Sequence, residues 1–530
     1  MSEFVCDGTP VSHEAFVRRA LDPGASAVVE ACAGSGKTWL LVGRIVRLLL
    51  AGAAPGQILA ITFTRRAAQE MRQRLLQDLA QLARADHDGV RDLLLQRGLD
   101  LREAQAALPA ARGLYERVAE PDDTVSIETF HGWFWRILRC APLGSGVPHT
   151  ANLLESTERM RQDAWGDFSA ELVEAEASGR GDAADGLLAA YEALLSRYGE
   201  SNTSKLLDNF LDKRAEWWSF AGGESEESAI DRACGPMRAA LDAAGFPSAE
   251  HPGRVLRGAA FTDALRALLG CWQAVAEPSA EQRKATHKAQ EFLSGGADPQ
   301  TDPALAADVL LTQKGTPRVQ LEPEEVARRN PALDARYPAW LGQAHDVLRR
   351  AQAAQEDWDA LHLNLAGLRC GVRLLRAFEA RKRQANVLDF TDIECFADRL
   401  LRSEDTAAYM QAHLDSRYRH LLVDEFQDTS TLQWRVLQCW LNAYEGDAQR
   451  PTVFVVGDPK QSIYRFRRAE PRVFEAARLH LAVTMGAAHL RTNVTRRNPA
   501  ALVAVLDAVF AGRNALYLSL IHISEPTRPY

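Results

Sequence analysis

A loop of small residues near the amino terminus constrains the fold of this chain more than any other feature. The sequence Ala-Cys-Ala-Gly-Ser-Gly-Lys-Thr occupies positions 31–38. It follows a short run containing Val28 and Val29, which favour a strand, and it precedes a segment at 39–50 whose apolar residues recur roughly at helical spacing. A strand, a glycine-containing loop and a helix in this order are typical of a phosphate-binding P-loop.

Several positions of this loop have an expected task. Gly34 and Gly36 let the backbone curl so that successive amide groups point inward. Lys37 can reach the terminal phosphates of a nucleotide, and the Thr38 hydroxyl can ligate magnesium. The usual pattern begins with glycine where this chain has Ala31, so an ordinary glycine-rich turn is the alternative. A P-loop by itself does not choose among kinases, transport ATPases, switches and motors.

Composition restricts the remaining possibilities. The 530-residue chain has a net charge of -8, so any contact with nucleic acid must use local basic patches. Its eight cysteines are scattered without a C-x-x-C pair, which argues against a zinc ribbon and a disulfide framework. The first ten residues are acidic, and no run of about 18 uncharged apolar residues occurs. We therefore expect a cytoplasmic protein that neither crosses nor binds a membrane.

Two further strands in the first part of the chain end in polar or aromatic residues. Residues 58–63 form an apolar run that ends at Phe63, and Thr64 can cap a helix that begins with Arg65. Arginines near the carboxyl end of a strand could hold a phosphate backbone. The strand at 124–127 precedes an aromatic segment at 128–139 that contains His131. Taken alone, the aromatic residues of that segment favour core packing, and His131 favours a structural role.

The second half of the chain contains two more strands with polar ends. The strand at 420–423 is followed by Asp424, which can hold magnesium, and by Glu425, which can accept a proton from an attacking water. After the strand at 452–456, Gln461 could sense the terminal phosphate. Tyr464 and Phe466, interleaved with arginines, could stack bases, and a packed aromatic corner is the alternative.

These stretches together resemble the superfamily 1 UvrD/Rep-type DNA helicases, and within them the AddA/RecB-like proteins of break repair. The resemblance is carried, in the same order along the chain, by residues 31–38, 61–75, 128–139, 421–433 and 455–470. It implies a fold of the α/β class, in which a P-loop RecA-like parallel sheet domain is split by a large all-α insertion. It also implies that the cofactors are ATP and Mg²⁺.

The resemblance assigns a role to each candidate residue. The ATP-binding residues are Ala31, Cys32, Ala33, Gly34, Ser35, Gly36, Lys37 and Thr38. The metal ligands are Thr38 and Asp424. The catalytic residues are Lys37, Glu425, Gln461 and Arg496. The residues that face single-stranded DNA are Phe63, Arg65, His131, Tyr464 and Phe466.

The same resemblance predicts the domain organisation. The first part of the RecA-like ATPase domain is expected at 1–140 and its second part at 385–486. Strand signals largely vanish between them, and residues 141–384 are expected to form a helical insertion domain. A second RecA-like domain is expected to start at 487–514. The segment 515–530 resembles translated sequencing-adapter read-through and is expected not to be native, with a genuine terminal tail as the alternative.

Two positions depart from the family pattern. Phe16 stands where many relatives have a glutamine that reads adenine, which puts base selectivity in doubt. The segment 489–499 lacks the usual aromatic residue before the arginine that contacts phosphate. Alignment from Pro499 backward gives that role to Arg496 and the aromatic place to Thr495, whereas a shift of one residue nominates Arg497.

The sequence therefore predicts an N-terminal fragment of an ATP-dependent DNA helicase or translocase, with 3′ to 5′ polarity, of recombinational or double-strand-break DNA repair. The expected partners are single-stranded DNA or a duplex end, and other subunits of a helicase-nuclease complex. We expect the 530-residue chain to bind ATP and single-stranded DNA without unwinding duplex. One alternative is a non-catalytic ATP- and DNA-binding subunit or scaffold. A P-loop kinase is the other, and it would leave the segments after the P-loop unexplained.

Overall fold

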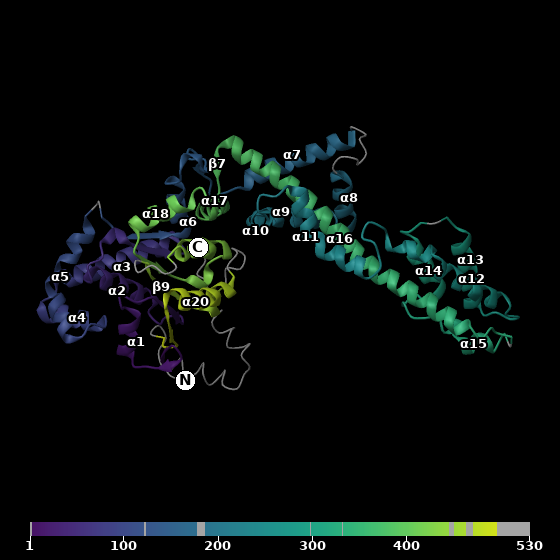
Figure 1. Ribbon diagram of the computed structural model, residues 1–530, viewed down its shortest axis with the longest axis horizontal. Helices are drawn as coiled ribbons and strands as arrows, with labels where there is room; N and C mark the ends of the chain where they lie inside the picture. Colours follow the sequence, from purple (N-terminus) through teal and green to yellow (C-terminus); the bar gives the residue numbers. More distant parts are fainter. Residues whose placement is uncertain are drawn as a thin grey trace. The chain divides into compact units, whose positions relative to one another are not determined.

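The computed structural model describes residues 3–120, 123–177, 186–296, 298–330, 332–444, 450–462 and 470–495 (Figure 1). The chain divides into two compact units. One unit is built from both ends of the chain, up to Ser156 and from Asn386 onward, and the other is Thr157–Ala385. The first is an α/β unit and the second is all helical, so the predicted fold class is confirmed.

An eight-stranded sheet forms the centre of the α/β unit, in the order β2-β1-β10-β3-β9-β8-β4-β5. The six strands from β10 to β5 are parallel to their neighbours, and β1 and β2 add an antiparallel edge. The strand bounds are β1 Phe4–Cys6, β2 Thr9–Pro10, β3 Ala27–Ala31, β4 Ile58–Thr62, β5 Ser126–Thr129, β8 His420–Val423, β9 Thr452–Gly457 and β10 Ala488–Thr492.

Alternating side chains of the parallel strands supply two hydrophobic cores, one on each face of the sheet. In β3, for example, Val29 packs into one core and Val28 into the other. Because both faces are buried, the strands read as continuous apolar runs. The core of Val29 includes helices α1 His13–Ala20, α2 Lys37–Leu50, α3 Arg65–Arg84, α4 His87–Gln96 and α5 Leu101–Ala119. The core of Val28 includes α6 Phe130–Arg139, α17 Phe390–Arg402, α18 Ala407–Arg417, α19 Thr431–Asn442 and α20 Pro471–Met485.

Short elements complete this unit. A two-stranded parallel sheet joins β6 Asn152–Leu153 to β7 Val387–Leu388, so the chain leaves and re-enters the α/β unit side by side. The 3₁₀ helices are η1 Pro55–Gln57, η2 Leu143–Ser145, η5 Phe426–Asp428 and η6 Pro459–Gln461.

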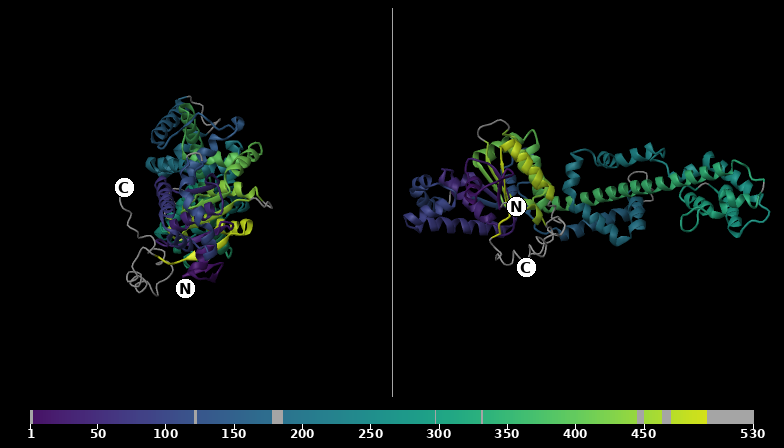
Figure 2. Two further views of the ribbon diagram at one scale, coloured as in Figure 1. Left: turned by 90° about the vertical axis from the view of Figure 1, so that its left-hand side faces the viewer. Right: turned by 90° about the horizontal axis from the view of Figure 1, so that it is seen from below.

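The helical unit is organised along α16 Tyr337–Ala385, a helix of 49 residues that runs unbroken in both views of Figure 2. Its first part packs in one core with α12 to α14, and its last part packs in another with α7, α8 and α9. The other helices of this unit are α7 Glu158–Ala177, α8 Leu187–Tyr198, α9 Glu200–Asp212, α10 Arg214–Ala221, α11 Glu226–Ala243, η3 Pro252–Arg257, α12 Ala259–Gln273, α13 Ala280–Ser294, α14 Asp302–Leu310, η4 Val319–Leu321 and α15 Pro323–Ala327.

Two details of the structure differ from the predicted boundaries. The helical unit begins at Thr157 rather than at 141, because β6 ties the preceding residues to the α/β unit. Strand β10 pairs in parallel with β3, so Ala488–Thr492 belongs to the first sheet and not to a second domain starting at 487. The rest of the predicted second domain beyond Thr495, and the segment 515–530, lie outside the described residues.

None of the helices in the described ranges combines the length and the apolar character that a membrane crossing requires.

Candidate functional site

The residues predicted to bind nucleotide form a strand-loop-helix turn at the carboxyl end of β3. Ala31 ends β3, and α2 begins at Lys37. Gly34 and Gly36 have positive φ angles of 75° and 95°, a backbone region that favours glycine. The amide of Ser35 donates a hydrogen bond to the Cys32 carbonyl at 3.2 Å, which closes the turn.

The loop fits a phosphate ligand. Gly36 precedes the first helical residue and supplies no side-chain cap, so no side chain at that position caps the amides of the first turn of α2. The Ser35 hydroxyl oxygen is buried, and it has no hydrogen-bond partner among the residues that the structure describes. Free amides at a helix amino terminus are a favourable site for an anion, and the buried hydroxyl gives one more polar group to satisfy.

Lys37 meets the acidic end of β8. Its Nζ donates a hydrogen bond to Glu425 Oε2 at 2.9 Å, across 388 positions of sequence. The Lys37 side chain is 10% exposed and that of Glu425 is 36% exposed. Because β3 and β8 both border β9 and are parallel to it, their carboxyl ends lie at the same edge of the sheet. The contact therefore joins the predicted phosphate loop to the predicted general base.

Asp424 and Glu425 are held by the backbone at the end of β8. The Asp424 amide donates to the Ile61 carbonyl at 2.8 Å, and the Glu425 amide donates to Asp424 Oδ1 at 2.9 Å. Glu425 has a φ angle of 48°, a left-handed conformation that costs energy for a residue with a side chain. This turn directs two neighbouring acids into separate surroundings, with Asp424 buried and Glu425 half-buried.

Burial raises the pKa of the Asp424 carboxyl above its usual range, and the neighbouring Glu425 raises it further. A cation would favour the ionised form of this carboxyl. Carboxylate and hydroxyl oxygens are ligands that Mg²⁺ prefers, so the donor set of Asp424 and Thr38 fits that ion.

Gln427 is a residue of this site to which the sequence analysis gave no role. Its Nε2 donates to Glu425 Oε2 at 2.8 Å, and its Oε1 accepts from the Asp458 amide at 2.9 Å. Asp458 Oδ2 in turn accepts from Gln461 Nε2 at 2.8 Å. The predicted phosphate sensor Gln461 is thereby connected to the predicted base through two side chains. The signal available in the sequence was a polar residue just after a strand end.

Asp428 is a second acidic residue that the sequence analysis gave no role. Its side chain is buried, and its Oδ1 has no hydrogen-bond partner among the described residues. Burial, and then the charge of Glu425, raise its pKa to about 7, although Lys37 acts in the opposite direction.

Two of the predicted DNA contacts follow β4. Phe63 is half-buried between the end of β4 and the start of α3. Thr64 caps α3, since its Oγ1 accepts a hydrogen bond from the Ala67 amide at 3.1 Å. Arg65 begins this helix and pairs with Glu155 at 2.9 Å, and both side chains are largely exposed.

His131 lies in the first turn of α6 with its side chain 32% exposed. Its Nε2 is 3.0 Å from Glu394 Oε1, and its ring centroid is 4.7 Å from that of Phe390. Trp133 and Phe134 on the same helix are fully buried, so the core interpretation of these two aromatic residues is confirmed.

Several other predicted positions can also be placed. Phe16 is buried in the core and its ring packs 5.2 Å from that of Phe4, so it fills a packing position. Tyr464, Phe466 and Arg496, with the alternative Arg497, lie outside the described residues.

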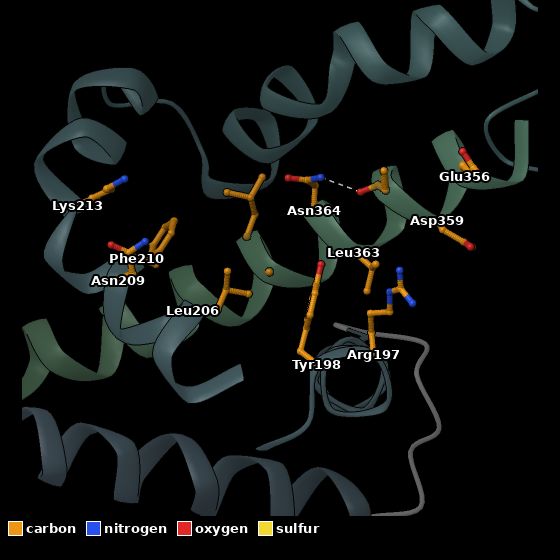
Figure 3. A pocket seen from close by; sticks show the side chains of 13 residues that line it. Arg197, Tyr198, Leu206, Asn209, Phe210, Lys213, Glu356, Asp359, Leu363 and Asn364 are labelled. Atoms are coloured by element: carbon orange, nitrogen blue, oxygen red, sulfur yellow. Dashed lines mark hydrogen bonds between the residues drawn. The ribbon is translucent and has the colours of Figure 1, made fainter. Parts of the chain in front are cut away.

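A pocket of about 670 Å³ lies inside the helical unit, away from every residue predicted to act (Figure 3). Side chains of α8, α9 and α16 line it, among them Tyr198, Leu206 and Asn364. The Asn364 amide donates to the Ala360 carbonyl of its own helix at 2.7 Å. The pocket holds none of the candidate nucleotide residues.

Comparison with known proteins gives a consistent result. The model of the UvrD/REP helicase N-terminal domain matches residues 14–294 and 327–481. AddA, the ATP-dependent helicase/nuclease subunit of Levilactobacillus brevis, is 28% identical over 475 residues, covering 85% of this chain and 34% of that protein. The protein of the same name from Staphylococcus carnosus is 41% identical over 102 residues, covering 19% of this chain and 8% of that protein.

A third relative with this name, from Staphylococcus epidermidis, is 38% identical over 128 residues, covering 24% of this chain and 10% of that protein. The match thus spans about a third of the length of the L. brevis protein and less of the other two. The resemblance drawn from the motifs is confirmed, and since the family model matches well over half of the chain, the chain belongs to the UvrD/Rep helicase family.

Proposed function

We propose that this chain carries the ATP-hydrolysing part of a DNA translocase or helicase that acts in recombinational or double-strand-break repair. The observation that carries the proposal is the contact of Lys37 with Glu425 at 2.9 Å, which brings a phosphate-binding loop and a general base together at one edge of a parallel sheet. Relatives whose names describe ATP-dependent helicase/nuclease subunits support the choice of a DNA-directed motor over other P-loop proteins.

In the proposed reaction, water attacks the terminal phosphate of ATP. Lys37 and the loop amides offset the negative charge that develops on the phosphate oxygens. Glu425 accepts the proton of the water, and its position is fixed by Gln427 and by the backbone turn at 425. Mg²⁺, bound by Thr38 and Asp424, supplies further charge neutralisation when present. Gln461 contacts the terminal phosphate, and Arg496 completes the site.

The DNA strand is proposed to run over the carboxyl ends of neighbouring strands. Phe63 and Arg65 follow β4, and His131 follows β5, which is the adjacent strand of the sheet. Tyr464 and Phe466 are proposed to stack bases on the same face. Polarity of 3′ to 5′ translocation, and association with other subunits of a helicase-nuclease complex, are inferred from the family and from the names of the relatives. Strand separation is proposed for a longer protein, because this chain covers only about a third of the L. brevis relative.

The decisive experiment is phosphate release by the chain with and without oligo(dT). We expect DNA to stimulate turnover, and we expect Lys37→Ala to abolish both the basal and the stimulated rate. Lys314→Ala, at an exposed position of the helical unit, is the matched control. Unchanged turnover in Lys37→Ala would refute the assigned site. Binding of both ATP and oligo(dT) without any turnover would instead favour a non-catalytic subunit or scaffold.

A further inference from the structure

Glu394 on α17 connects the predicted DNA face to the segment that carries the predicted base. Its side chain is only 7% exposed. Its Oε1 lies 3.0 Å from His131 Nε2 on α6, and the same oxygen accepts a hydrogen bond from Gln433 Nε2 on α19 at 2.6 Å. One buried carboxylate oxygen therefore holds two helices that each follow a different strand of the sheet.

Gln433 passes this contact on to the end of the acidic segment. Its Oε1 accepts from the Ser430 amide at 3.1 Å, and its own amide donates to Ser430 Oγ at 3.1 Å. This capping box fixes the first turn of α19. Ser430 comes two residues after Asp428, and the short η5 helix links it back to Glu425. The chain of contacts thus runs from His131 to the residue that holds Lys37.

His131 is seated by one face of α17. Phe390 packs against the imidazole at 4.7 Å between ring centroids, and Glu394, one helical turn later, meets its Nε2. The other part of the ring is open, since the side chain is 32% exposed. A ligand that contacts His131 would therefore press on a side chain whose far side is bonded to the buried carboxylate.

Packing alone does not call for a glutamate at this place. A buried carboxylate costs free energy unless its hydrogen bonds are made, and an apolar side chain of similar size would fill the same volume. Coupling between two sites is carried by contiguous contacts of this kind when they have two arrangements that both ligands bias.

We propose that Glu394 is a positioning residue that couples a DNA strand at His131 to the ATP site at Glu425. This inference rests on the proposed function, since it needs ATP and single-stranded DNA as ligands. The coupling is reciprocal, so oligo(dT) changes the affinity for ATP by the same factor by which ATP changes the affinity for oligo(dT).

The test measures that factor in the full chain, as the ratio of the dissociation constants for a fluorescent non-hydrolysable ATP analogue without and with saturating oligo(dT). For the unaltered chain we expect a ratio of about 5 or more. Glu394→Ala removes both hydrogen bonds, and His131→Ala removes one end of the path, so each should bring the ratio below about 2. Glu394→Gln keeps an oxygen that can accept both bonds and should retain more of the ratio than Glu394→Ala.

Because the ratio is taken within each variant, a uniform loss of affinity or stability does not imitate the effect. His131→Ala changes a half-exposed side chain, so it carries the test if Glu394→Ala fails to fold. Glu404→Gln, at an exposed position after α17, is the control for charge. In the double variant of Glu394 and His131, the loss should equal that of either single variant.

Two results would overturn the inference: a ratio near 1 in a chain that binds both ligands, or a ratio that survives in both Glu394→Ala and His131→Ala. Failure of the unaltered chain to bind the ATP analogue would instead overturn the proposed function, and the coupling with it.

Discussion

Lys37 and Glu425 are 388 positions apart in sequence, and Lys37 Nζ donates to Glu425 Oε2 at 2.9 Å. In the proposed mechanism, Lys37 contacts a phosphate and Glu425 contacts the attacking water. The two side chains must therefore exchange this bond for bonds to ligand when ATP enters. Their contact places both groups within reach of one reacting centre, and it gives each a separate experimental signature.

The first prediction separates binding from chemistry at Glu425. Glu425→Gln can still accept a hydrogen bond from Lys37, but it cannot take a proton from water. We expect phosphate release to fall by about 10² to 10⁴, while affinity for an ATP analogue changes by less than about threefold. Single-turnover phosphate release and a fluorescence titration measure the two quantities. A normal turnover rate in this variant would show that Glu425 is not the base.

The second prediction concerns Gln427, which joins Glu425 to the Asp458 amide. A Cβ atom on Gly457 would lie 2.6 Å from Gln427 Oε1 and 2.8 Å from Phe474 Cε2, so Gly457→Ala must displace one of these side chains. We expect Gly457→Ala and Gln427→Ala to lower the rate of hydrolysis about tenfold, the value of one or two lost hydrogen bonds.

Gly113→Ala is the matched control for Gly457→Ala, because an added Cβ there meets no atom within 4 Å. It lies inside α5, where alanine is the better helix former, so we expect unchanged hydrolysis and equal or higher stability. Full activity in Gly457→Ala would mean that Gln427 does not position the base.

The sequence was sufficient to predict the strands that carry the site, because both faces of the sheet are buried and the strands read as apolar runs. Strand β10 was not recognised as part of this sheet, since its Ala-His-Leu-Arg-Thr sequence alternates apolar and polar residues near the sheet edge. Its membership is decided by pairing with β3, which lies more than 450 positions earlier, and local propensity does not carry that information.

The candidate site shows the same limit. The tasks of Lys37, Asp424 and Glu425 follow from their residue types and from their places at strand ends. The connection through Gln427 depends on the Asp458 amide, 31 positions further along the chain. The contact of His131 with Glu394 depends on the packing of α6 against α17. Contacts of this kind arise from tertiary packing, so residue pattern alone could not predict them.

The third prediction distinguishes stacking from charge on the proposed DNA face. Phe63→Ala should weaken binding to oligo(dT) by about 1 to 3 kcal/mol with little change in the salt dependence, because stacking releases no counterions. Arg65→Ala should weaken binding and also reduce the slope of log K against log salt by about 1. Binding isotherms at four salt concentrations measure both effects.

Glu155→Gln provides the opposite test for Arg65. Glu155 pairs with the Arg65 guanidinium at 2.9 Å, and its removal should free that group for phosphate and strengthen DNA binding modestly. If Phe63→Ala and Arg65→Ala leave affinity unchanged, the strand does not run over the end of β4.

The fourth prediction uses the pKa of Asp428, which burial raises to about 7. Between about pH 4 and pH 7 the folded chain keeps a proton that the unfolded chain has lost, so this group lowers stability as pH rises through that range. Asp428→Asn removes the cost of the charge. We expect the variant to be more stable than the unaltered chain by about 2 kcal/mol at pH 8.5 and equally stable at pH 4, after allowance for solvent screening.

Urea unfolding of both chains at the two pH values measures this difference. Asp405→Asn, at an exposed position, is the control and should show no pH-dependent gain. A variant that is less stable at pH 8.5 would mean that the Asp428 carboxylate is compensated in the folded chain.

The fifth prediction has the opposite sign and concerns His420, the first residue of β8. Its Nδ1 lies 2.8 Å from Thr452 Oγ1 on the neighbouring strand. Burial, with the charges of Arg44 and Arg419, lowers the pKa of the imidazole to about 4. Between about pH 6.5 and pH 4 the unfolded chain therefore binds a proton that the folded chain excludes, and stability falls as pH decreases through this window.

The expected loss is at most about 3 kcal/mol, from 1.36 kcal/mol for each pKa unit. His420→Asn cannot take up a proton, so its free energy of unfolding should lack this component, and the difference between the two chains should change by that amount between pH 7 and pH 4. His149→Asn, at an exposed position, should leave the pH dependence in place. Parallel pH dependences of the unaltered chain and His420→Asn would show that the folded chain accepts the proton at His420 without cost, and that β8 tolerates a charge beside Arg44.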